Sequence, residues 1–262
     1  MYPVISRRSK GLSIGINLNP DRVCNFNCIY CQVDRSGPAP PGDVRLEAVE
    51  GELRQLLAER DKIFEDSNLR AIPAGLRAVR DIAFSGDGEP TASPLFPDAA
   101  RMVARIRGEF GLDAAKIIVL TNASHLTEPQ VVAALDFLDR HNGEVWAKLD
   151  AGTQEYFERV NRSSYRLTTI VQNILATARI RPVVIQSLFM RIDGQPPPET
   201  EVAAYVDQLR RLVSQLGQLR LVQVYTVARR PAEPYVEQLG PAELESIASR
   251  VRKLGVPVEV YT

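Results

Sequence analysis

Short apolar runs alternate along the chain with longer segments in which apolar residues recur every three or four positions. The short runs are apolar on both faces, which is typical of parallel strands buried between layers of helices. These runs predict strands at Leu12–Asn17, Asp81–Ser85, Ile117–Thr121, Val145–Asp150, Val183–Met190, Leu221–Thr226 and Val258–Tyr261.

The periodic segments predict amphipathic helices between these strands. Apolar residues follow helical spacing from Leu46 to Leu57, from Val131 to Leu138 and from Val202 to Val213. A last helix is expected to begin at Pro241, which suits a first turn, and to run toward Lys253 before Gly255 stops it.

Alternation of strand and helix, repeated about six times, predicts an α/β fold with a mainly parallel sheet. Periodicity alone leaves open whether the sheet curls into a barrel or stays an open, doubly wound sheet. No linker divides the chain, so we expect one domain over residues 1–262. Three irregular loops, Gln32–Asp43, Asp66–Ala78 and the stretch around Pro196–Pro198, are candidates for covering the C-terminal strand ends, where functional loops of parallel folds gather.

Composition narrows the functional classes. With 45% hydrophobic and 24% charged residues, the chain is neither largely disordered nor fibrous. Lys plus Arg equals Asp plus Glu at 32 each, so nucleic-acid binding would need a local basic patch rather than an overall charge. No apolar run approaches the ~18 residues of a membrane span, and the N-terminal segment lacks the apolar core of a signal peptide, so we expect a cytoplasmic protein without a membrane contact.

The three cysteines of the chain lie together just after the first expected strand. Cys24, Cys28 and Cys31 form a C-x3-C-x2-C pattern. An odd number of cysteines in so short a loop does not suit a disulfide framework, but three thiolates can converge on a metal or an iron–sulfur cluster. A cluster of four irons with three protein ligands has one open iron. Structural zinc is the alternative, although the two histidines, His125 and His141, are far away in sequence.

This cysteine pattern, with Tyr30 directly before the last cysteine, resembles the signature of the radical S-adenosylmethionine (radical SAM) superfamily. The resemblance implies a partial (β/α)6 barrel of the TIM type. It also implies that Cys24, Cys28 and Cys31 hold a [4Fe–4S] cluster whose fourth iron binds S-adenosylmethionine. In that family, one electron from the cluster cleaves the sulfonium and yields a 5′-deoxyadenosyl radical, which abstracts hydrogen from a substrate.

A glycine-rich turn after the second expected strand strengthens the resemblance. Gly86, Asp87, Gly88 and Glu89 resemble the family's Gly-Gly-Glu element, which contacts the cofactor's ammonium group, although Asp87 replaces the commoner glycine. Glycines let the backbone approach a ligand closely, and a carboxylate can accept hydrogen bonds from an ammonium group.

Further candidates for cofactor binding lie at the ends of later strands. Lys148 and Asp150 share one strand face and resemble family positions for the cofactor carboxylate and ribose, with an internal ion pair as the alternative. Asn122 either faces the barrel mouth or caps a helix. The remaining candidates are Gln186, which interrupts an apolar run, Arg191 at a strand end, and Val224 at the level where family members contact adenine.

The opening SRRSKGLSIGINLNP and the segment YTVARRP look most like stand-alone radical SAM proteins related to the tRNA wybutosine-synthesis enzymes. Those relatives carry a second cysteine set, for which this chain has no cysteine left. We therefore expect a one-cluster radical enzyme with an unassigned substrate and an external electron donor, flavodoxin or ferredoxin. Two alternatives stay open: a tRNA substrate, bound through Arg7, Arg8, Arg229 and Arg230, and a non-catalytic iron–sulfur or zinc protein.

Overall fold

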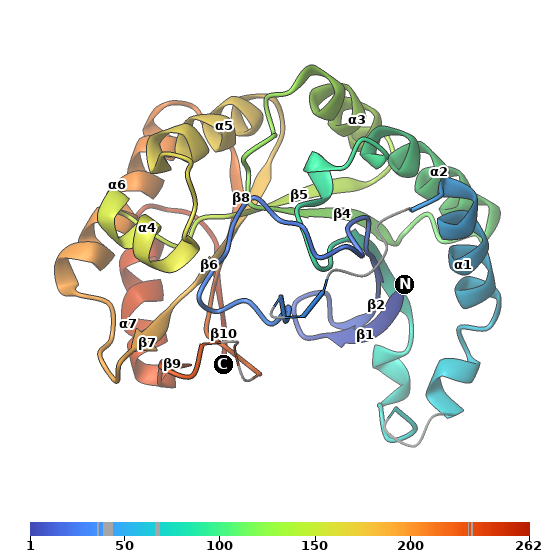
Figure 1. Ribbon diagram of the computed structural model, residues 1–262, viewed down its shortest axis with the longest axis horizontal. Helices are drawn as coiled ribbons and strands as arrows, with labels where there is room; N and C mark the ends of the chain where they lie inside the picture. Colours follow the sequence, from blue (N-terminus) through green and yellow to red (C-terminus); the bar gives the residue numbers. More distant parts are fainter. Residues whose placement is uncertain (36, 39–43, 66–68, 230, 232) are drawn as a thin grey trace. The chain divides into compact units, whose positions relative to one another are not determined.

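The computed structural model (Figure 1) describes residues 1–262 except 36, 39–43, 66–68, 230 and 232. The chain divides into two compact units. Unit 1 comprises residues 1–23, 39–120 and 128–144, and unit 2 comprises residues 24–38, 121–127 and 145–262. The expectation of a single domain stays a prediction.

The sheet of unit 1 has the strand order β1–β2–β3–β4. Its strands are β1 (Tyr2–Ser6), β2 (Gly11–Ile16), β3 (Val79–Phe84) and β4 (Lys116–Thr121). The last three run parallel, as their apolar sequences predict, whereas β1 returns antiparallel along β2. The pairing with β1 depends on a glycine, because a Cβ atom at Gly15 would lie 2.2 Å from the ring of Tyr2.

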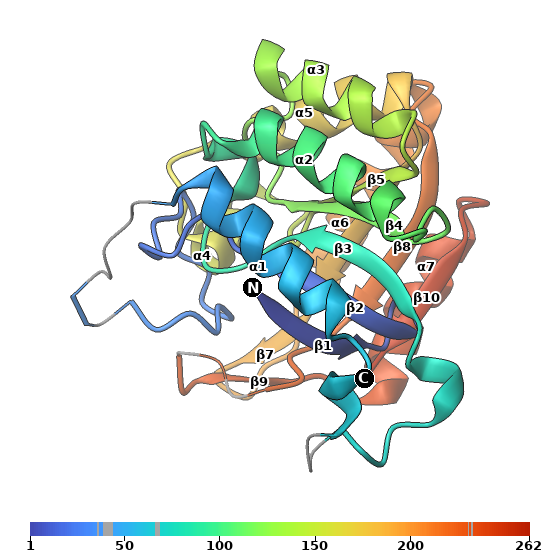
Figure 2. The ribbon, with the colours of Figure 1, turned by 90° about the vertical axis from the view of Figure 1, so that its right-hand side faces the viewer.

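Helices α1 (Leu46–Ala58), α2 (Phe96–Glu109) and α3 (Pro129–Asp139) lie side by side in unit 1 (Figure 2). Phe84 of β3 packs edge-to-face on Phe96 of α2, with ring centroids 5.3 Å apart, so this face of β3 points toward the helices. Alternate residues along a strand point to opposite faces, so Asp81 and Ala83 point away from them. Short 3-10 turns cover Lys62–Glu65, Ala74–Leu76 and Pro90–Ala92.

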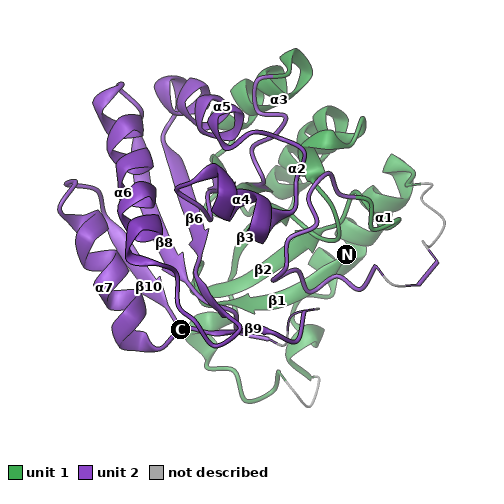
Figure 3. Cartoon of the chain, turned by 60° about the vertical axis from the view of Figure 1, so that its left-hand side comes forward, with its two compact units in different colours: residues 1–23, 39–120, 128–144 green, residues 24–38, 121–127, 145–262 purple. Residues whose placement is uncertain are grey.

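Unit 2 contains parallel strands in the order β5–β6–β8–β10 (Figure 3). They are β5 (Gly143–Lys148), β6 (Val183–Leu188), β8 (Leu219–Tyr225) and β10 (Val258–Tyr261). The helices of unit 2 are α4 (Gln154–Asn161), α5 (Leu167–Ile180), α6 (Glu199–Ser214) and α7 (Pro241–Arg252). Ser187 of β6 hydrogen-bonds to the hydroxyl of Tyr205 in α6, so Ser187 faces the helices and its neighbour Gln186 faces the opposite side.

The expected strand Val183–Met190 is two elements rather than one. The chain leaves the parallel sheet at Phe189, whose N–H donates to the carbonyl of Tyr225. It then forms β7 (Met190–Ile192), which pairs antiparallel with β9 (Val236–Gln238). The apolar run is continuous, so hydrophobicity alone does not show where the pairing partner changes.

The other expected strands coincide with observed strands to within two residues at each end, and β10 matches its predicted bounds. The helix at Pro241 is also confirmed as α7. The sequence reading missed β1 and β9, both of which pair antiparallel. In the described part of the chain, no helix has both the length and the apolar character needed to cross a membrane.

Candidate functional site

The cysteine loop, residues 24–31, lies in unit 2 and is anchored on helix α4. The N–H of Asn27 donates to the carbonyl of Asn161 at 3.1 Å, and the N–H of Ile29 donates to the carbonyl of Val160 at 2.9 Å. Phe26 is buried and packs edge-to-face on Phe157 of the same helix, with ring centroids 5.6 Å apart. The end of α4 therefore holds the middle of the loop by backbone hydrogen bonds and by apolar packing.

None of the three thiols takes part in a disulfide, and all three are half-buried. Each sulfur accepts a hydrogen bond from a different nitrogen. The backbone nitrogen of Phe26 lies 3.5 Å from Cys24 Sγ. Asn161 Nδ2 lies 3.4 Å from Cys28 Sγ, and Arg35 Nη1 lies 3.0 Å from Cys31 Sγ. N–H donors of this kind stabilise sulfur that carries negative charge. Each sulfur of the loop therefore has an N–H donor within hydrogen-bond distance.

Burial raises the pKa of Cys28 to about 12, and the negative charge of Asp150 acts in the same direction. A metal that binds Cys28 must therefore displace its proton, as metals generally do on binding cysteine.

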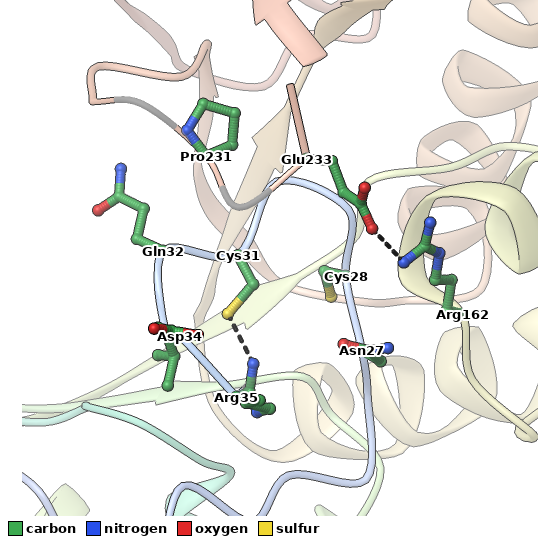
Figure 4. Close-up of a pocket in the computed structure, with 10 residues that line it drawn as sticks. Asn27, Cys28, Cys31, Gln32, Asp34, Arg35, Arg162, Pro231 and Glu233 are labelled. Atoms are coloured by element: carbon green, nitrogen blue, oxygen red, sulfur yellow. Dashed lines mark hydrogen bonds and ion pairs between the residues drawn. The ribbon is translucent and has the colours of Figure 1, made fainter. Parts of the chain in front are cut away.

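Cys28 and Cys31 line a cavity of about 430 Å³ within unit 2 (Figure 4). Arg35 and Cys31 meet at one side of it, and the ion pair between Arg162 and Glu233 lies at another. The remaining lining residues are Asn27, Gln32, Val33, Asp34 and Pro231. The cavity is thus bordered by two of the three thiols and by charged side chains of both signs.

A buried carboxylate ties the cysteine loop to the sheet. Asp150 follows β5, is 2% exposed, and accepts hydrogen bonds from the hydroxyl of Tyr30 at 2.5 Å and from the N–H of Leu188 at 2.8 Å. Asn161 Nδ2 donates to it at 3.4 Å, and the ammonium group of Lys148 lies 3.0 Å away. The internal Lys148–Asp150 ion pair is therefore present, and both carboxylate oxygens have protein donors.

Lys148 also donates to the hydroxyl of Tyr225 at 2.6 Å and lies over the rings of Tyr30 and Tyr225, 4.9 and 4.8 Å from their centroids. Burial by itself would lower the pKa of Lys148, but the attraction of Asp150 and Tyr225 outweighs burial and raises it. Burial and the charge of Asp150 raise the pKa of Tyr30 well above its usual value, so Tyr30 is a hydroxyl donor. The binding of cofactor by Lys148 and Asp150 stays a prediction.

The glycine-rich turn lies in unit 1, directly after β3. Gly86 has a φ of +144°, and a Cβ atom there would lie 2.6 Å from Asn17 Oδ1. A Cβ atom at Gly88 would lie 2.2 Å from the carbonyl oxygen of Val23. Both positions thus need glycine, one for its backbone conformation and both for the close approach of neighbouring groups.

The two carboxylates of this turn bind neighbouring protein groups. Asp87 accepts a hydrogen bond from Asn17 Nδ2 at 2.8 Å. Glu89 is 3% exposed and caps the turn Pro90–Ala92 by accepting from the N–H and the hydroxyl of Thr91 at 3.1 and 2.6 Å. The proposed contacts of Gly86, Asp87, Gly88 and Glu89 with a cofactor stay predictions.

Asn122 follows β4 and contacts the cysteine loop. Its Nδ2 donates to Asn25 Oδ1 at 2.7 Å, and its Oδ1 accepts from the N–H and hydroxyl of Ser124. It is not a helix cap, because the N-cap residue of α3 is Glu128. His125 is near the loop as well, with its Nε2 atom 3.2 Å from Asn25 Nδ2, despite the long separation in sequence.

Gln186 is fully buried, and its Nε2 atom donates to Gln223 Oε1 at 2.7 Å. A polar residue within an apolar run is expected to face either a polar cavity or another buried polar group, and the structure shows the second. Arg191 donates to Glu243 at 2.6 Å, so the carboxylate that it holds in the structure is a protein one. Val224 is buried and pairs with Ser187 in the β6–β8 register. Cofactor contacts of Gln186, Arg191 and Val224 stay predictions.

The arginines proposed for tRNA are only partly described. Arg7 and Arg8 belong to unit 1, Arg229 is exposed in unit 2, and Arg230 lies outside the described residues. The sequence reading missed Asn25, Arg35 and Asn161, which contact the cysteines or their neighbours. Asn25 and Arg35 are close to the cysteines in sequence, but nothing in the sequence marks Asn161.

No protein-family model matches the chain. Solved structures do: Streptococcus suis SuiB bound to S-adenosylmethionine is similar with a TM-score of 0.66 at 12% identity, over 98% of this chain and 52% of that chain. A radical SAM methyltransferase from Sphaerobacter thermophilus also has a TM-score of 0.66, at 16% identity, over 99% of this chain and 68% of its own.

TYW1 with a lysine-pyruvate adduct bound gives a TM-score of 0.55 at 14% identity, over 94% of this chain and 74% of that chain. Because these sequence identities are low, the similarity shows only that this chain shares the fold of these proteins. The expected fold class, a mostly parallel α/β partial barrel, is therefore confirmed, and the resemblance to the radical SAM superfamily is confirmed at the level of the fold.

Among curated proteins, the chain is similar to the UPF0026 protein of Helicobacter pylori strain J99, with 27% identity over 214 residues, which are 80% of this chain and 61% of the relative. The UPF0026 protein of strain 26695 is 30% identical over 184 residues, or 68% of this chain and 51% of the relative. The matched part of the chain thus spans between half and two thirds of the length of these relatives.

Proposed function

We propose that this protein is a radical SAM enzyme that binds one iron–sulfur cluster through Cys24, Cys28 and Cys31. The observation that carries the proposal is the cysteine loop itself: three cysteines outside any disulfide lie within eight residues, each sulfur accepts an N–H hydrogen bond, and two of the three line a cavity. The likeness in fold to SuiB bound to S-adenosylmethionine supports the same cofactor here.

The donor set fits a cluster better than a single metal ion. Within the described ranges, no three His, Cys, Asp or Glu side chains are arranged to hold one ion. A cluster makes a different demand, because each thiolate binds a different iron and the three sulfurs do not have to meet at one point. The N–H donors on the three sulfurs match the way in which proteins surround cluster ligands.

When bound, the [4Fe–4S] cluster would supply the electron that cleaves S-adenosylmethionine to methionine and a 5′-deoxyadenosyl radical. The protein's own contribution is positional. Asp150 fixes Tyr30 between two of the ligands, and Asn161 joins the same carboxylate to Cys28 Sγ. In unit 1, the glycines of the turn Gly86–Glu89 make room for Asn17 and for the carbonyl oxygen of Val23, and a contact of this turn with the amino-acid part of a cofactor is proposed from the sequence resemblance alone.

The proposal is tested by reconstitution. Purified protein is loaded with iron and sulfide without oxygen, reduced with dithionite and given S-adenosylmethionine. We expect iron and sulfide to be retained and 5′-deoxyadenosine to be released, as measured by chromatography. Cys24→Ala, Cys28→Ala and Cys31→Ala proteins are expected to lose the cluster absorbance and all cleavage. A loaded and reduced wild-type protein that releases no 5′-deoxyadenosine would contradict the proposed chemistry.

The substrate and the electron donor remain at the level of prediction. A flavodoxin or ferredoxin suits the need for single electrons, and a tRNA substrate is the alternative suggested by Arg7, Arg8 and Arg229. Salt-dependent tRNA binding that survives replacement of these arginines by alanine would exclude them as the tRNA-binding residues. A non-catalytic zinc or iron–sulfur protein is distinguished by the same metal analysis, because zinc without labile sulfide would favour it.

A further inference from the structure

We infer that Arg35 is a positioning residue that raises the reduction potential of the cluster bound by the cysteine loop. The inference rests on the proposed function, since it concerns a property of that cluster. Arg35 follows Cys31 by four residues, and its Nη1 atom lies 3.0 Å from Cys31 Sγ. Figure 4 shows the guanidinium group directed at this sulfur from the side of the cavity.

The three sulfurs of the loop differ in the charge of the donor that each receives. Cys24 accepts from the backbone N–H of Phe26, and Cys28 accepts from the amide of Asn161. Both of these donors are neutral. Cys31 accepts from a guanidinium group, which is permanently charged in proteins.

Two other cations near the loop have carboxylate partners. Lys148 is paired with Asp150 at 3.0 Å, and Arg162 donates to Glu233 at one side of the cavity. Their charges are therefore largely balanced locally. The contact of Arg35 with Cys31 differs because the acceptor is one of the proposed ligands of the cluster.

Reduction adds one negative charge to a cluster and its ligands. A charged N–H donor on a ligand sulfur favours the more negative, reduced state, because hydrogen bonds and nearby charge set the potential of iron–sulfur centres. Arg35 should thus make the cluster easier to reduce than the same loop without the cation. A neutral donor at the same place provides only part of this effect.

The test is a redox titration of the reconstituted protein, with the reduced cluster monitored by electron paramagnetic resonance. Wild type is compared with Arg35→Gln, Arg35→Lys and a matched control, Arg159→Gln. Arg159 is an exposed arginine of α4 that pairs with Asp193 and contacts none of the cysteines in the described structure. Iron and sulfide are measured in every preparation before the titration.

We expect a midpoint potential that is more negative in Arg35→Gln than in wild type, an intermediate value in Arg35→Lys, and no shift in Arg159→Gln. Equal midpoint potentials in Arg35→Gln and wild type would overturn the inference. So would loss of the cluster from both Arg35 variants when Arg159→Gln retains it, because Arg35 would then serve retention instead. A wild-type protein without iron and sulfide would remove the proposed function itself, and this inference with it.

Discussion

Two buried aspartates, Asp150 in unit 2 and Asp81 in unit 1, show how differently the same side chain is used in this protein. They are 2% and 1% exposed. Asp150 has hydrogen-bond donors on both oxygens and an ammonium group at 3.0 Å. Asp81 accepts from the hydroxyl of Ser13 through Oδ1, whereas its Oδ2 atom has no hydrogen-bond partner among the described residues.

The difference lies in what compensates the buried charge. An ionised carboxylate loses its hydration on burial, and only partners can replace it. Burial raises the pKa of Asp81, because the hydrogen bonds from Ser13 and Ser9 and the attraction of Lys116 do not offset it. Asp150, by contrast, joins the cysteine loop, a strand and a helix end in one network. Equal burial therefore does not mean an equal role.

The largest expected effect is that of Asp150→Ala. Removing this carboxylate takes an acceptor away from the Lys148 ammonium group, whose side chain is 14% exposed, and from the Tyr30 hydroxyl, so we expect the free energy of unfolding to fall by about 3–5 kcal/mol. Urea unfolding of the metal-free protein measures it, with Asp193→Ala as control, since Asp193 is exposed and its ion pair with Arg159 is 3.6 Å long. Similar losses in the two variants would refute the role of Asp150 as a central acceptor.

Tyr30→Phe removes one hydrogen bond of the Asp150 network and keeps the ring over which Lys148 lies. A hydrogen bond to a charged group is worth about 1.5–3 kcal/mol, so we expect a loss of that size. Combining Tyr30→Phe with Asp150→Ala should cost less than the sum of the single changes, because the two residues share one interaction. Strict additivity in denaturant unfolding would argue against their coupling.

Unlike the two preceding substitutions, Asp81→Asn should increase the free energy of unfolding at neutral pH. The raised pKa means that the folded state binds a proton more readily than the unfolded state, so stability is highest below the ordinary aspartate pKa and declines as pH rises through the folded-state value. We expect the Asp81→Asn protein to be more stable than wild type by about 1 kcal/mol at neutral pH. We also expect its stability to fall less steeply than that of wild type as pH rises. Thermal unfolding between pH 4 and 8 tests it, and a parallel pH profile in wild type and variant would contradict the assignment.

Much of the fold could be predicted because its strands are buried on both faces. Val258–Tyr261 coincides with β10, and the helix beginning at Pro241 coincides with α7, since local apolar patterns and turn residues specify both. The hairpin strand β1 was missed because its pairing depends on the space that Gly15 leaves for the Tyr2 ring, a contact between two segments. The end of β6 at Leu188 was missed because the apolar run continues through the point where pairing with β8 gives way to pairing with β9.

The ligands of the candidate site were readable for a different reason. Cys24, Cys28 and Cys31 lie within one short loop, so their spacing in the sequence is enough to mark them as candidate ligands. Their hydrogen-bond donors are of two kinds. Arg35 is close in sequence and could have been considered, whereas Asn161 is 133 residues from Cys28 and reaches its sulfur only because α4 packs against the loop.

The amino-acid order by itself thus determined the parallel α/β class and the cysteine trio, because the apolar pattern of a strand and the spacing of three cysteines are local properties. Only the tertiary structure decided that Tyr30 donates to Asp150 across 120 residues, that Lys148 balances this carboxylate, and that each sulfur has its own N–H donor. Hydrogen bonds and ion pairs need atoms within about 3 Å of each other, and for residues far apart in the chain that distance is set by folding.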